Sequence, residues 1–338
     1  MNDSNRPAVL RLGTRRSLLA RTQSEHVAQA LRDSAGVDVE LVDITTEGDL
    51  SSAPLAQIGG TGVFVSALRQ ALLDGRIDLA VHSLKDLPTA PAEGITLAAV
   101  PPREDPRDAL VARDGLTLGE LGPGDRVGTG APRRAAQLRA LDLGLEVVDV
   151  RGNVDTRLRA VTDGVLDAVV LARAGLLRIG RAGEATEVLD PLQMLPAPGQ
   201  GALALECRAD DETVRSMLAP LDDLPSRACT EAERSLLAVL EGGCSAPVGA
   251  LADWVEGDDG PELYLRAVAA APDGSRDLRR STTGPVHEPQ ALGARLAAVM
   301  LEDGAADIVR PQTSVIDSSA VADSSAVPDS SAVQESEQ

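Results

Sequence analysis

Short apolar runs and longer amphipathic runs alternate along most of the chain, and this alternation restricts the fold more than any other feature. The first unit begins with the apolar residues 9–12, turns at Gly13-Thr14-Arg15-Arg16 and continues as a helix to about residue 33, with Ser17 as its N-cap. Similar patterns predict strands at 37–45, 77–81, 147–150 and 167–171, and helices at 63–74, 132–141 and from 154 onward. Strands that alternate with helices favour doubly wound α/β domains with parallel sheets.

Two of the predicted strand-to-helix turns resemble each other. Gly13-Thr14 is followed by Arg15 and Arg16, and Gly128-Thr129 is followed by Arg133 and Arg134. Two similar domains that face each other across a cleft would direct both turns at one ligand. The match is short, so the residues alone leave chance as an equal explanation.

The C-terminal third has a different pattern. A helix at 228–240, strands around 246–251 and 263–270, and a helix at 289–302 predict a small α+β domain. Beyond it, Asp-Ser-Ser-Ala-Val occurs at 317–321, 323–327 and 329–333. This polar repeat has too little apolar side chain to offset the entropy lost on ordering, so we predict a disordered tail.

A formal net charge of −20 and an aromatic content of 1% exclude several classes of function. We expect no binding to nucleic acid or to anionic membranes through a broad surface, although a local basic pocket stays open. No run approaches the ~20 apolar residues of a membrane span, and no signal peptide is recognised. Three scattered cysteines are too few for a disulfide framework or a zinc site, so we expect a cytoplasmic protein that binds no metal.

The densest polar segment is Val81-His82-Ser83-Leu84-Lys85-Asp86-Leu87-Pro88, which follows a predicted apolar strand. The carboxyl ends of parallel strands are where α/β domains bind ligands. Lys85 is the only lysine of the chain, and it lies beside the carboxylate of Asp86. The alternative is a solvated loop with a surface Lys–Asp pair.

Six arginines form a second candidate group, and most of them lie in or beside strand-to-helix turns. Helix N-termini expose N–H groups and partial positive charge, and arginine binds carboxylates through two parallel hydrogen bonds. For any single arginine, pairing with a surface Asp or Glu is an equal alternative, whereas the repeated position favours a polyanion site for the group. The six are Arg15, Arg133, Arg134, Arg151, Arg157 and Arg178.

Two glycine-containing segments complete the candidates. Gly59-Gly60-Thr61-Gly62 lacks the Lys-Ser/Thr ending of a P-loop, so we interpret it as a mobile lid or a tight loop. Gly242-Gly243-Cys244 gives a flexible approach to a lone cysteine. From spacing alone, such a cysteine is more often a small buried hydrophobe than a nucleophile.

Taken together, these segments resemble the porphobilinogen deaminase family, and they occur in that family's order across residues 8–310. The matching motifs are Gly13-Thr14-Arg15 with Ser17, Pro54-Leu55-Ala56 through Gly62-Val63-Phe64, Val81 through Pro88, Arg103-Glu104-Asp105-Pro106-Arg107-Asp108-Ala109, Gly128-Thr129 with Arg133-Arg134, Arg151-Gly152-Asn153-Val154 with Thr156-Arg157-Leu158, Leu195-Pro196-Ala197-Pro198-Gly199-Gln200-Gly201, and Glu241-Gly242-Gly243-Cys244.

The resemblance implies two α/β domains of the periplasmic-binding-protein type, joined by crossings near residues 101 and 197, and a small α+β domain that carries the cysteine. We therefore predict domain 1 at 1–101 and 198–220, domain 2 at 102–197, domain 3 at 221–312 and the tail at 313–338. The resemblance also implies a monomer.

It further implies a transferase, hydroxymethylbilane synthase, that condenses four porphobilinogen units head to tail with loss of ammonia. The units add to a dipyrromethane cofactor held by a thioether to Cys244, and water then releases hydroxymethylbilane. Asp86 matches the catalytic aspartate, which stabilises positive charge on the pyrroles and assists proton transfer. The resemblance assigns cofactor binding to Ser83, Lys85, Arg133, Arg134 and Arg157, and substrate binding to Arg15, Ser17, Phe64, Arg151, Arg178 and Gln200.

Three departures from the family pattern bear on substrate contacts. Gln57 and Thr61 stand where well-known members carry loop lysines, Gly130-Ala131 where serines are common, and Asp155 where a small residue is usual. Asp86, the arginines and Cys244 are unaffected. Two rival interpretations are a non-catalytic binding protein, which gives Cys244 no role, and a structural protein built around the repeat tail, which leaves the arginine turns unexplained.

Overall fold

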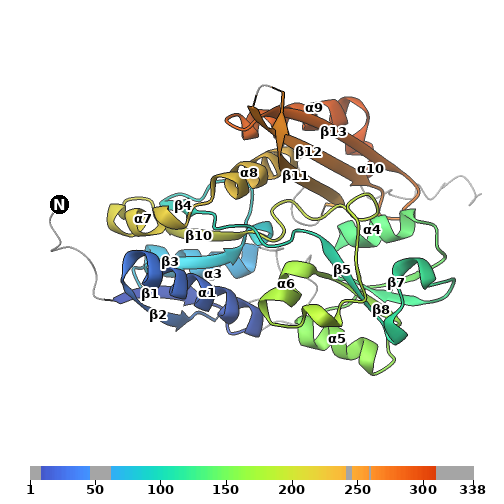
Figure 1. Ribbon diagram of the computed structural model, residues 1–338, viewed down its shortest axis with the longest axis horizontal. Helices are drawn as coiled ribbons and strands as arrows, with labels where there is room; N and C mark the ends of the chain where they lie inside the picture. The colour runs from blue at the N-terminus through green and yellow to red at the C-terminus, as the bar shows by residue number, and fades with distance from the viewer. Residues whose placement is uncertain (1–8, 46–61, 241–245, 259, 310–338) are drawn as a thin grey trace, which may run out of the picture.

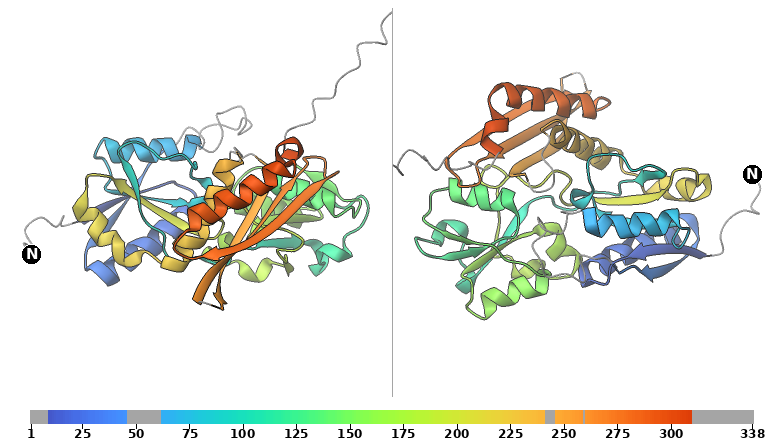
Figure 2. Two further views of the ribbon diagram at one scale, coloured as in Figure 1. Left: turned by 90° about the horizontal axis from the view of Figure 1, so that it is seen from above. Right: turned by 180° about the vertical axis from the view of Figure 1, so that it is seen from behind.

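The computed structural model describes residues 9–45, 62–240, 246–258 and 260–309. Within these ranges the chain forms three sheets, each covered by its own helices (Figure 1). Two α/β units lie side by side, and the third unit packs over their junction (Figure 2). The predicted disordered tail lies outside the described residues.

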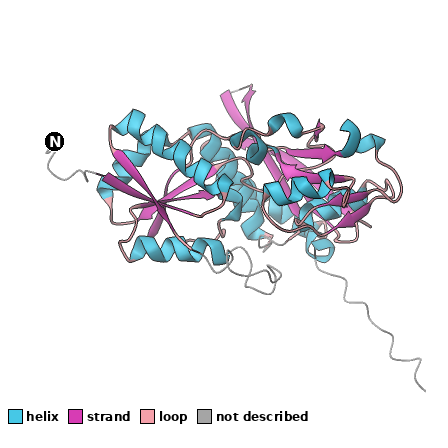
Figure 3. Ribbon diagram, turned by 90° about the horizontal axis from the view of Figure 1, so that it is seen from below, coloured by secondary structure: helices cyan, strands magenta, loops and turns pink. Residues whose placement is uncertain are grey.

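The first sheet has the strand order β2-β1-β3-β10-β4. Its helices cover both faces, as Figure 3 shows with the sheet nearly edge-on. Leu10, Leu12 and Leu79 pack under α1 and α7, while Leu68 and Leu72 of α3 cover the opposite face. The elements are β1 (Val9–Thr14), α1 (Leu18–Ala35), β2 (Asp38–Asp43), α3 (Gly62–Leu73), β3 (Leu79–Ser83), η2 (Leu84–Asp86), β4 (Ile95–Ala99), β10 (Leu203–Arg208), α7 (Glu212–Leu218) and η6 (Ala219–Leu221).

The second sheet repeats this arrangement in the order β7-β6-β8-β5-β9. Leu138 of α4 packs on one face, and Leu158 of α5 and Leu176 of α6 pack on the other. The elements are β5 (Asp108–Ala112), η3 (Arg113–Gly115), η4 (Leu118–Glu120), β6 (Arg126–Gly128), α4 (Pro132–Ala140), β7 (Glu146–Val148), α5 (Val154–Thr162), β8 (Ala168–Ala172), α6 (Arg173–Arg178), η5 (Ala182–Glu184) and β9 (Glu187–Val188).

The third sheet is an antiparallel meander, β11-β12-β13, with its helices packed on one core. Ala136 of α4 and Leu195 contact Leu251 and Val268 of this sheet, so the second and third units share a small apolar interface. The elements are α8 (Leu224–Val239), β11 (Val248–Gly257), β12 (Gly260–Ala270), β13 (Asp277–Pro285), α9 (Pro289–Glu302) and α10 (Ala305–Val309).

The prediction of parallel sheets holds for β1, β2 and β3 and for β6, β7 and β8, but not for the whole of either sheet. β10 runs antiparallel to β3 and β4, and β5 runs antiparallel to β8 and β9. β5 follows a connection from the first sheet, which we call the first crossing (residues 100–107). β10 follows a connection from the second sheet, which we call the second crossing (residues 189–202). Without a crossover helix, each strand enters its sheet at the end where the parallel strands finish, so it runs the opposite way.

The similarity between the two turns reflects a structural repeat. β1 and β6 occupy the same position in sheets of the same order. A Cβ on Gly13 would lie 2.3 Å from Ile77 Cδ1, and one on Gly128 would lie 2.5 Å from Leu166 Cδ1. Both glycines therefore permit close packing at the end of the equivalent strand. The fold class of two such α/β units plus a small α+β unit is confirmed.

Candidate active site

The segment after β3 is anchored by its leucines. Leu84 and Leu87 are buried, and the Leu84 N–H donates to Ala202 O at 3.0 Å. The Arg234 guanidinium of α8 donates to the Leu87 carbonyl at 2.9 Å, which ties the turn to the third unit. Lys85 and Asp86 lie half-buried between these anchors. This is a constrained turn and not the solvated loop that the sequence left as an alternative.

Lys85 contacts the second crossing. Its ammonium group donates to Gln200 Oε1 at 3.3 Å. Burial lowers the pKa of Lys85 from its ordinary value of 10.5 to about 8, and the adjacent Asp86 opposes that shift. The group therefore titrates far closer to neutral pH than a surface lysine does.

The arginine pair of α4 is buried and holds an internal carboxylate. Pro132 begins α4, and Arg133 and Arg134 follow in its first turn. Arg133 Nη2 donates to Asp108 Oδ2 at 2.8 Å, and Arg134 donates to Oδ1 from Nε at 3.1 Å and from Nη2 at 2.8 Å. Burial raises the pKa of Asp108, but the two guanidinium groups outweigh it and hold the pKa well below its usual range.

Gln200 joins these groups. Its amide NH2 donates to Asp108 Oδ1 at 2.7 Å and to Pro106 O at 2.7 Å, and its Oε1 accepts from Lys85 and, at 3.4 Å, from Arg134 Nη2. The side chain is 1% exposed. The side-chain amide of Gln200 thus connects Lys85, Arg134 and Asp108.

Arg151 lies in the neighbouring turn between β7 and α5, and Arg157 lies in the first turn of α5. Arg157 Nε donates to Gly152 O at 3.0 Å, and Arg151 forms an exposed ion pair with Asp149 at 3.4 Å. Burial lowers the pKa of Arg157, and positive charge on Arg134 and Arg151 acts in the same direction. The carboxylate of Asp149 opposes that shift of the Arg157 pKa.

Two departures from the family pattern have a structural reason. A Cβ on Gly130 would lie 2.7 Å from Val150 O, so the β6–α4 turn packs closer to β7 than a serine in the same place would allow. Asp155 accepts from Arg181 Nη1 at 2.6 Å, and so it is held in an ion pair at the start of α5. The departures at Gln57 and Thr61 lie outside the described residues.

The first sheet contributes the other side of the site. Arg15 lies half-buried in the turn after β1. The Ser17 hydroxyl accepts from the Ala20 N–H at 3.3 Å, which confirms its predicted N-cap. Gln23 of α1 donates to the Ser83 hydroxyl at 3.3 Å and joins α1 to the end of β3.

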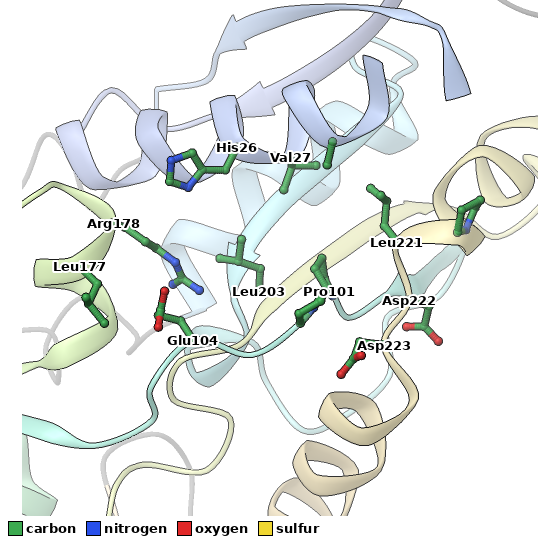
Figure 4. A pocket seen from close by; sticks show the side chains of 13 residues that line it. His26, Val27, Pro101, Glu104, Leu177, Arg178, Leu203, Leu221, Asp222 and Asp223 are labelled. Atoms are coloured by element: carbon green, nitrogen blue, oxygen red, sulfur yellow. The ribbon is translucent and has the colours of Figure 1, made fainter. Parts of the chain in front are cut away.

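Arg178 is placed apart from the arginine pair. It lines a cavity of about 530 Å³ between α1, α6, the first crossing and η6, where it faces Glu104 and His26 (Figure 4). Its Nη2 donates to Gly201 O at 2.5 Å, next to Gln200 in the chain. Burial lowers the pKa of Arg178, and Glu104 opposes that shift.

Two predicted site residues cannot be placed. Cys244 lies outside the described residues, and Phe64 is described only as part of the α3 backbone. The other two cysteines are buried, and burial raises the pKa of Cys207 to about 11 and that of Cys229 to about 12. Both therefore stay protonated at neutral pH, which makes them poor nucleophiles.

Sequence reasoning missed the carboxylates that hold the site together. Asp108 belongs to one of the matching motifs but had no predicted role. An aspartate directly before the apolar run 109–112 is a signal that could have identified it as a site residue. Glu233 of α8 was missed entirely. It is 0% exposed and accepts from Arg103 Nη1 at 2.7 Å and Nη2 at 3.0 Å.

The site fits a ligand with several carboxylates. Lys85, Arg133 and Arg134 surround the single buried carboxylate of Asp108, with Arg157 beside them. Arg133 Nε is buried and makes no hydrogen bond within the part of the chain that the structure describes. Buried donors of this kind are normally satisfied, so surplus positive charge and an orphan N–H favour an anionic partner. The fold thus defines a protein of two α/β units and a small α+β unit, and its buried cationic cluster favours an anionic ligand.

Comparisons with known proteins identify the family of this chain. Residues 10–216 match the family model "Porphobilinogen deaminase, dipyromethane cofactor binding domain", and residues 227–302 match "Porphobilinogen deaminase, C-terminal domain". The chain is 60% identical to a porphobilinogen deaminase of Nocardia farcinica, over 89% of this chain and 88% of the relative. It is 57% identical to that of Mycobacterium tuberculosis, over 89% and 98%.

The chain belongs to the porphobilinogen deaminase family, and it is an enzyme that acts on porphobilinogen and contains that family's dipyrromethane-binding domain. Among solved structures, the methionine-binding protein MetQ matches 63% of this chain and 89% of its own, at 17% identity and a TM-score of 0.40. That score is too low to support any conclusion. None of the helices in the described ranges is long and apolar enough to cross a membrane.

Proposed function

We propose that Asp86 is the catalytic carboxylate of hydroxymethylbilane synthesis and that Cys244 carries the dipyrromethane primer through a thioether. The observation that supports Asp86 most directly is its position. It follows buried β3 on a turn held by Leu84 and Leu87, beside Lys85, which reaches across to the arginine pair through Gln200. A carboxylate fixed there can face a ligand whose own carboxylates are held by cations.

The cationic groups would hold the pyrrole chain by its carboxylates. When bound, dipyrromethane supplies the nucleophilic ring carbon to which porphobilinogen units are joined with loss of ammonia. With four added units the chain carries about twelve acetate and propionate groups, which suits arginine because its guanidinium binds carboxylates in pairs. We assign the primer to Ser83, Lys85, Arg133, Arg134 and Arg157, and the incoming and added units to Arg15, Ser17, Phe64, Arg151 and Arg178.

Asp86 would act on the ring nitrogens. Its carboxylate can accept hydrogen bonds from pyrrole N–H groups and so stabilise the positive charge that develops as ammonia leaves. It can also take the proton that the attacking ring loses after the new bond forms. Lys85 is unsuited to that step at neutral pH, because with a pKa of about 8 it is largely protonated. Its charge would hold carboxylates of the primer.

The organisation of the chain supports further proposals. Domain 1 at 1–101 and 198–220, domain 2 at 102–197 and domain 3 at 221–312 agree with the grouping of strands into three sheets. The two crossings would then form the hinge between domains 1 and 2. We also propose that the protein acts as a monomer in the cytoplasm, where the free thiol of Cys244 can accept the primer.

Intact-mass measurement tests the primer. The purified protein is expected to exceed its sequence mass by two porphobilinogen units less two ammonia, with peptide mapping placing the excess on Cys244. Cys244→Ser removes the excess, whereas the matched variant Cys229→Ser retains it, because that thiol is buried. An unmodified wild-type mass after incubation with porphobilinogen or hydroxymethylbilane would refute the proposal.

Turnover by Asp86→Asn tests the catalytic assignment. The variant is expected to keep the primer mass while kcat falls on the order of 10²- to 10⁴-fold, the usual effect of losing a general acid–base group. Asp303→Asn is the control, since Asp303 is an exposed partner of Arg280 in the third unit. Wild-type kcat in Asp86→Asn would remove Asp86 from the mechanism.

A further inference from the structure

We propose that Asp108 and Gln200 form a positioning pair for the condensation reaction, in which Asp108 orients the two arginines of α4 and Gln200 holds Lys85 in register with them. The inference rests on the proposed function, because it assigns these contacts a role in placing the primer opposite Asp86. Asp108 and Gln200 are 0% and 1% exposed, so neither is available to touch a ligand directly.

Asp108 fixes both guanidinium groups from one carboxylate. Each oxygen serves a different arginine: Oδ2 accepts from Arg133, and Oδ1 accepts two N–H groups of Arg134. Arg133 also donates to Leu195 O and Arg134 to Val170 O. Because several donors of each guanidinium are fixed by acceptors of the protein, only a defined part of each remains to meet the primer.

Gln200 connects this carboxylate to the turn that carries Lys85 and Asp86, through both ends of its side-chain amide. Its NH2 group donates to Asp108, while its carbonyl oxygen accepts from Lys85. An ionised carboxylate in its place could not donate to Asp108. The backbone carbonyl of Gln200 also accepts from Arg103 Nε at 2.8 Å, so the residue is held at both ends.

The pair lies where three parts of the chain meet. Asp108 begins β5 of the second sheet, Gln200 belongs to the second crossing, and Lys85 follows β3 of the first sheet. A movement of the second sheet relative to the first would therefore have to stretch or break the Gln200 contacts. The distance between Asp86 and the arginine pair is thus set by this bridge.

Electrostatics alone predicts a different outcome from positioning. Lys85 faces the negative charges of Asp86 and Asp108 and the positive charges of Arg133 and Arg134. If Asp108 did no more than reduce the net positive charge, neutralising Asp108 would strengthen the attraction for the carboxylates of porphobilinogen and lower KM. If Asp108 positions the arginines, neutralising it lowers kcat because the primer is displaced, whatever the gain in charge.

The test uses Asp108→Asn in the full-length enzyme, with kcat and KM for porphobilinogen measured alongside thermal unfolding. We expect kcat to fall on the order of 10- to 100-fold, the range that misplacement by about 1 Å produces, with KM changed by less than about two-fold. Asp105→Asn is the matched control. Asp105 lies three residues earlier and also pairs with two arginines, Arg107 and Arg173, yet it has no contact with Gln200 in the described structure.

Gln200→Met provides a second test that changes no charge. It removes the donor to Asp108 and the acceptor for Lys85 at nearly constant volume. We expect kcat to fall about ten-fold and the alkaline limb of kcat/KM to move to lower pH, because the Lys85 ammonium loses an acceptor that stabilises its charged form. Asp105→Asn should keep the wild-type kcat and limb.

The proposal is overturned if Asp108→Asn and Gln200→Met melt at lower temperature but keep wild-type kcat and pH profile, since the pair would then be a structural contact only. A lower KM with unchanged kcat in Asp108→Asn would overturn it in favour of simple charge dilution. If Asp108→Asn does not fold, Gln200→Met decides alone. Absence of the primer mass from the wild-type enzyme would instead refute the proposed function, so the two failures are distinguishable.

Discussion

Glu233 offers the sharpest prediction about stability. Its fully buried carboxylate accepts four N–H groups: two from Arg103, one from Gly199 at 2.6 Å and one from Ala252 at 2.9 Å. These donors come from the first crossing, the second crossing and β11. Glu233→Gln keeps the shape of the side chain but replaces one acceptor oxygen with an NH2 group. That NH2 group would face N–H donors and could not accept a hydrogen bond from them.

The expected cost follows from what is left unpaired. Removing one partner of a buried ion pair costs about 3–5 kcal/mol, because the other charge stays buried without compensation. Arg103 would be in that position, since its side chain is only 9% exposed. A backbone N–H that loses its acceptor adds about 1–3 kcal/mol. The total is comparable with the whole stability of many domains, about 5–15 kcal/mol.

Thermal unfolding followed by circular dichroism measures the effect. At about 1.4 °C per kcal/mol for a chain of 338 residues, Glu233→Gln should lower Tm by at least about 6 °C. The control is Asp303→Asn in the same unit, where an exposed pair with Arg280 contributes about 0–1 kcal/mol. Arg103→Met combined with Glu233→Gln should be more stable than Glu233→Gln alone, because no buried guanidinium is left uncompensated. A Tm loss as small as that of the control would refute the reasoning.

Three other predictions concern Lys85 and Gly201. As pH rises through about 8, Lys85 becomes neutral and no longer attracts carboxylates, so kcat/KM should fall. Lys85→Arg should stay active to higher pH, and a pH–rate series on both enzymes tests this. The pKa of Lys85 in the folded protein lies below its ordinary value of 10.5. Between about pH 8 and pH 10.5 the unfolded chain therefore binds more protons than the folded protein. The contribution of Lys85 to the free energy of unfolding thus rises with pH over that window. Urea midpoints of the wild type and Lys85→Met, compared across that window, check the sign. Gly201→Ala should lower stability by about 1–3 kcal/mol or more, because its φ is +89° and a Cβ would lie 2.3 Å from Glu104 O. Gly119→Ala, which meets nothing within 4 Å, should melt close to the wild type.

Local signals in the sequence were reliable because the structures they predict are local. Ser17 caps α1, and Pro132 begins α4 as predicted. Each depends on hydrogen bonds or dihedral angles within one turn of the same residue, so neighbouring residues suffice to predict it. The start of α8 was missed by four residues because its cap, Asp223, accepts from Ser226 ahead of the apolar run used to place it.

The contacts that organise the site could not be predicted in the same way. Gln200 and Asp108 are 92 residues apart, and Arg103 and Glu233 are 130 apart. β5 and β10 were also missed, because a strand buried on both faces lacks the alternation that identifies a half-buried one. The family resemblance supplied the arginines and Asp86, but it did not reveal that a buried aspartate holds two of those arginines.

The geometry of the crossings would couple the anion site to any movement between the two α/β units. The two crossings touch each other, since the Glu104 N–H donates to Gly201 O at 3.3 Å and Arg103 donates to Gln200 O. Gln200 is at the same time a neighbour of Lys85 and of the arginine pair. A rotation of either α/β unit about the crossings must therefore change the relation between Lys85 and Arg134. If the two crossings form the hinge proposed above, that hinge and the proposed anion site share Gln200.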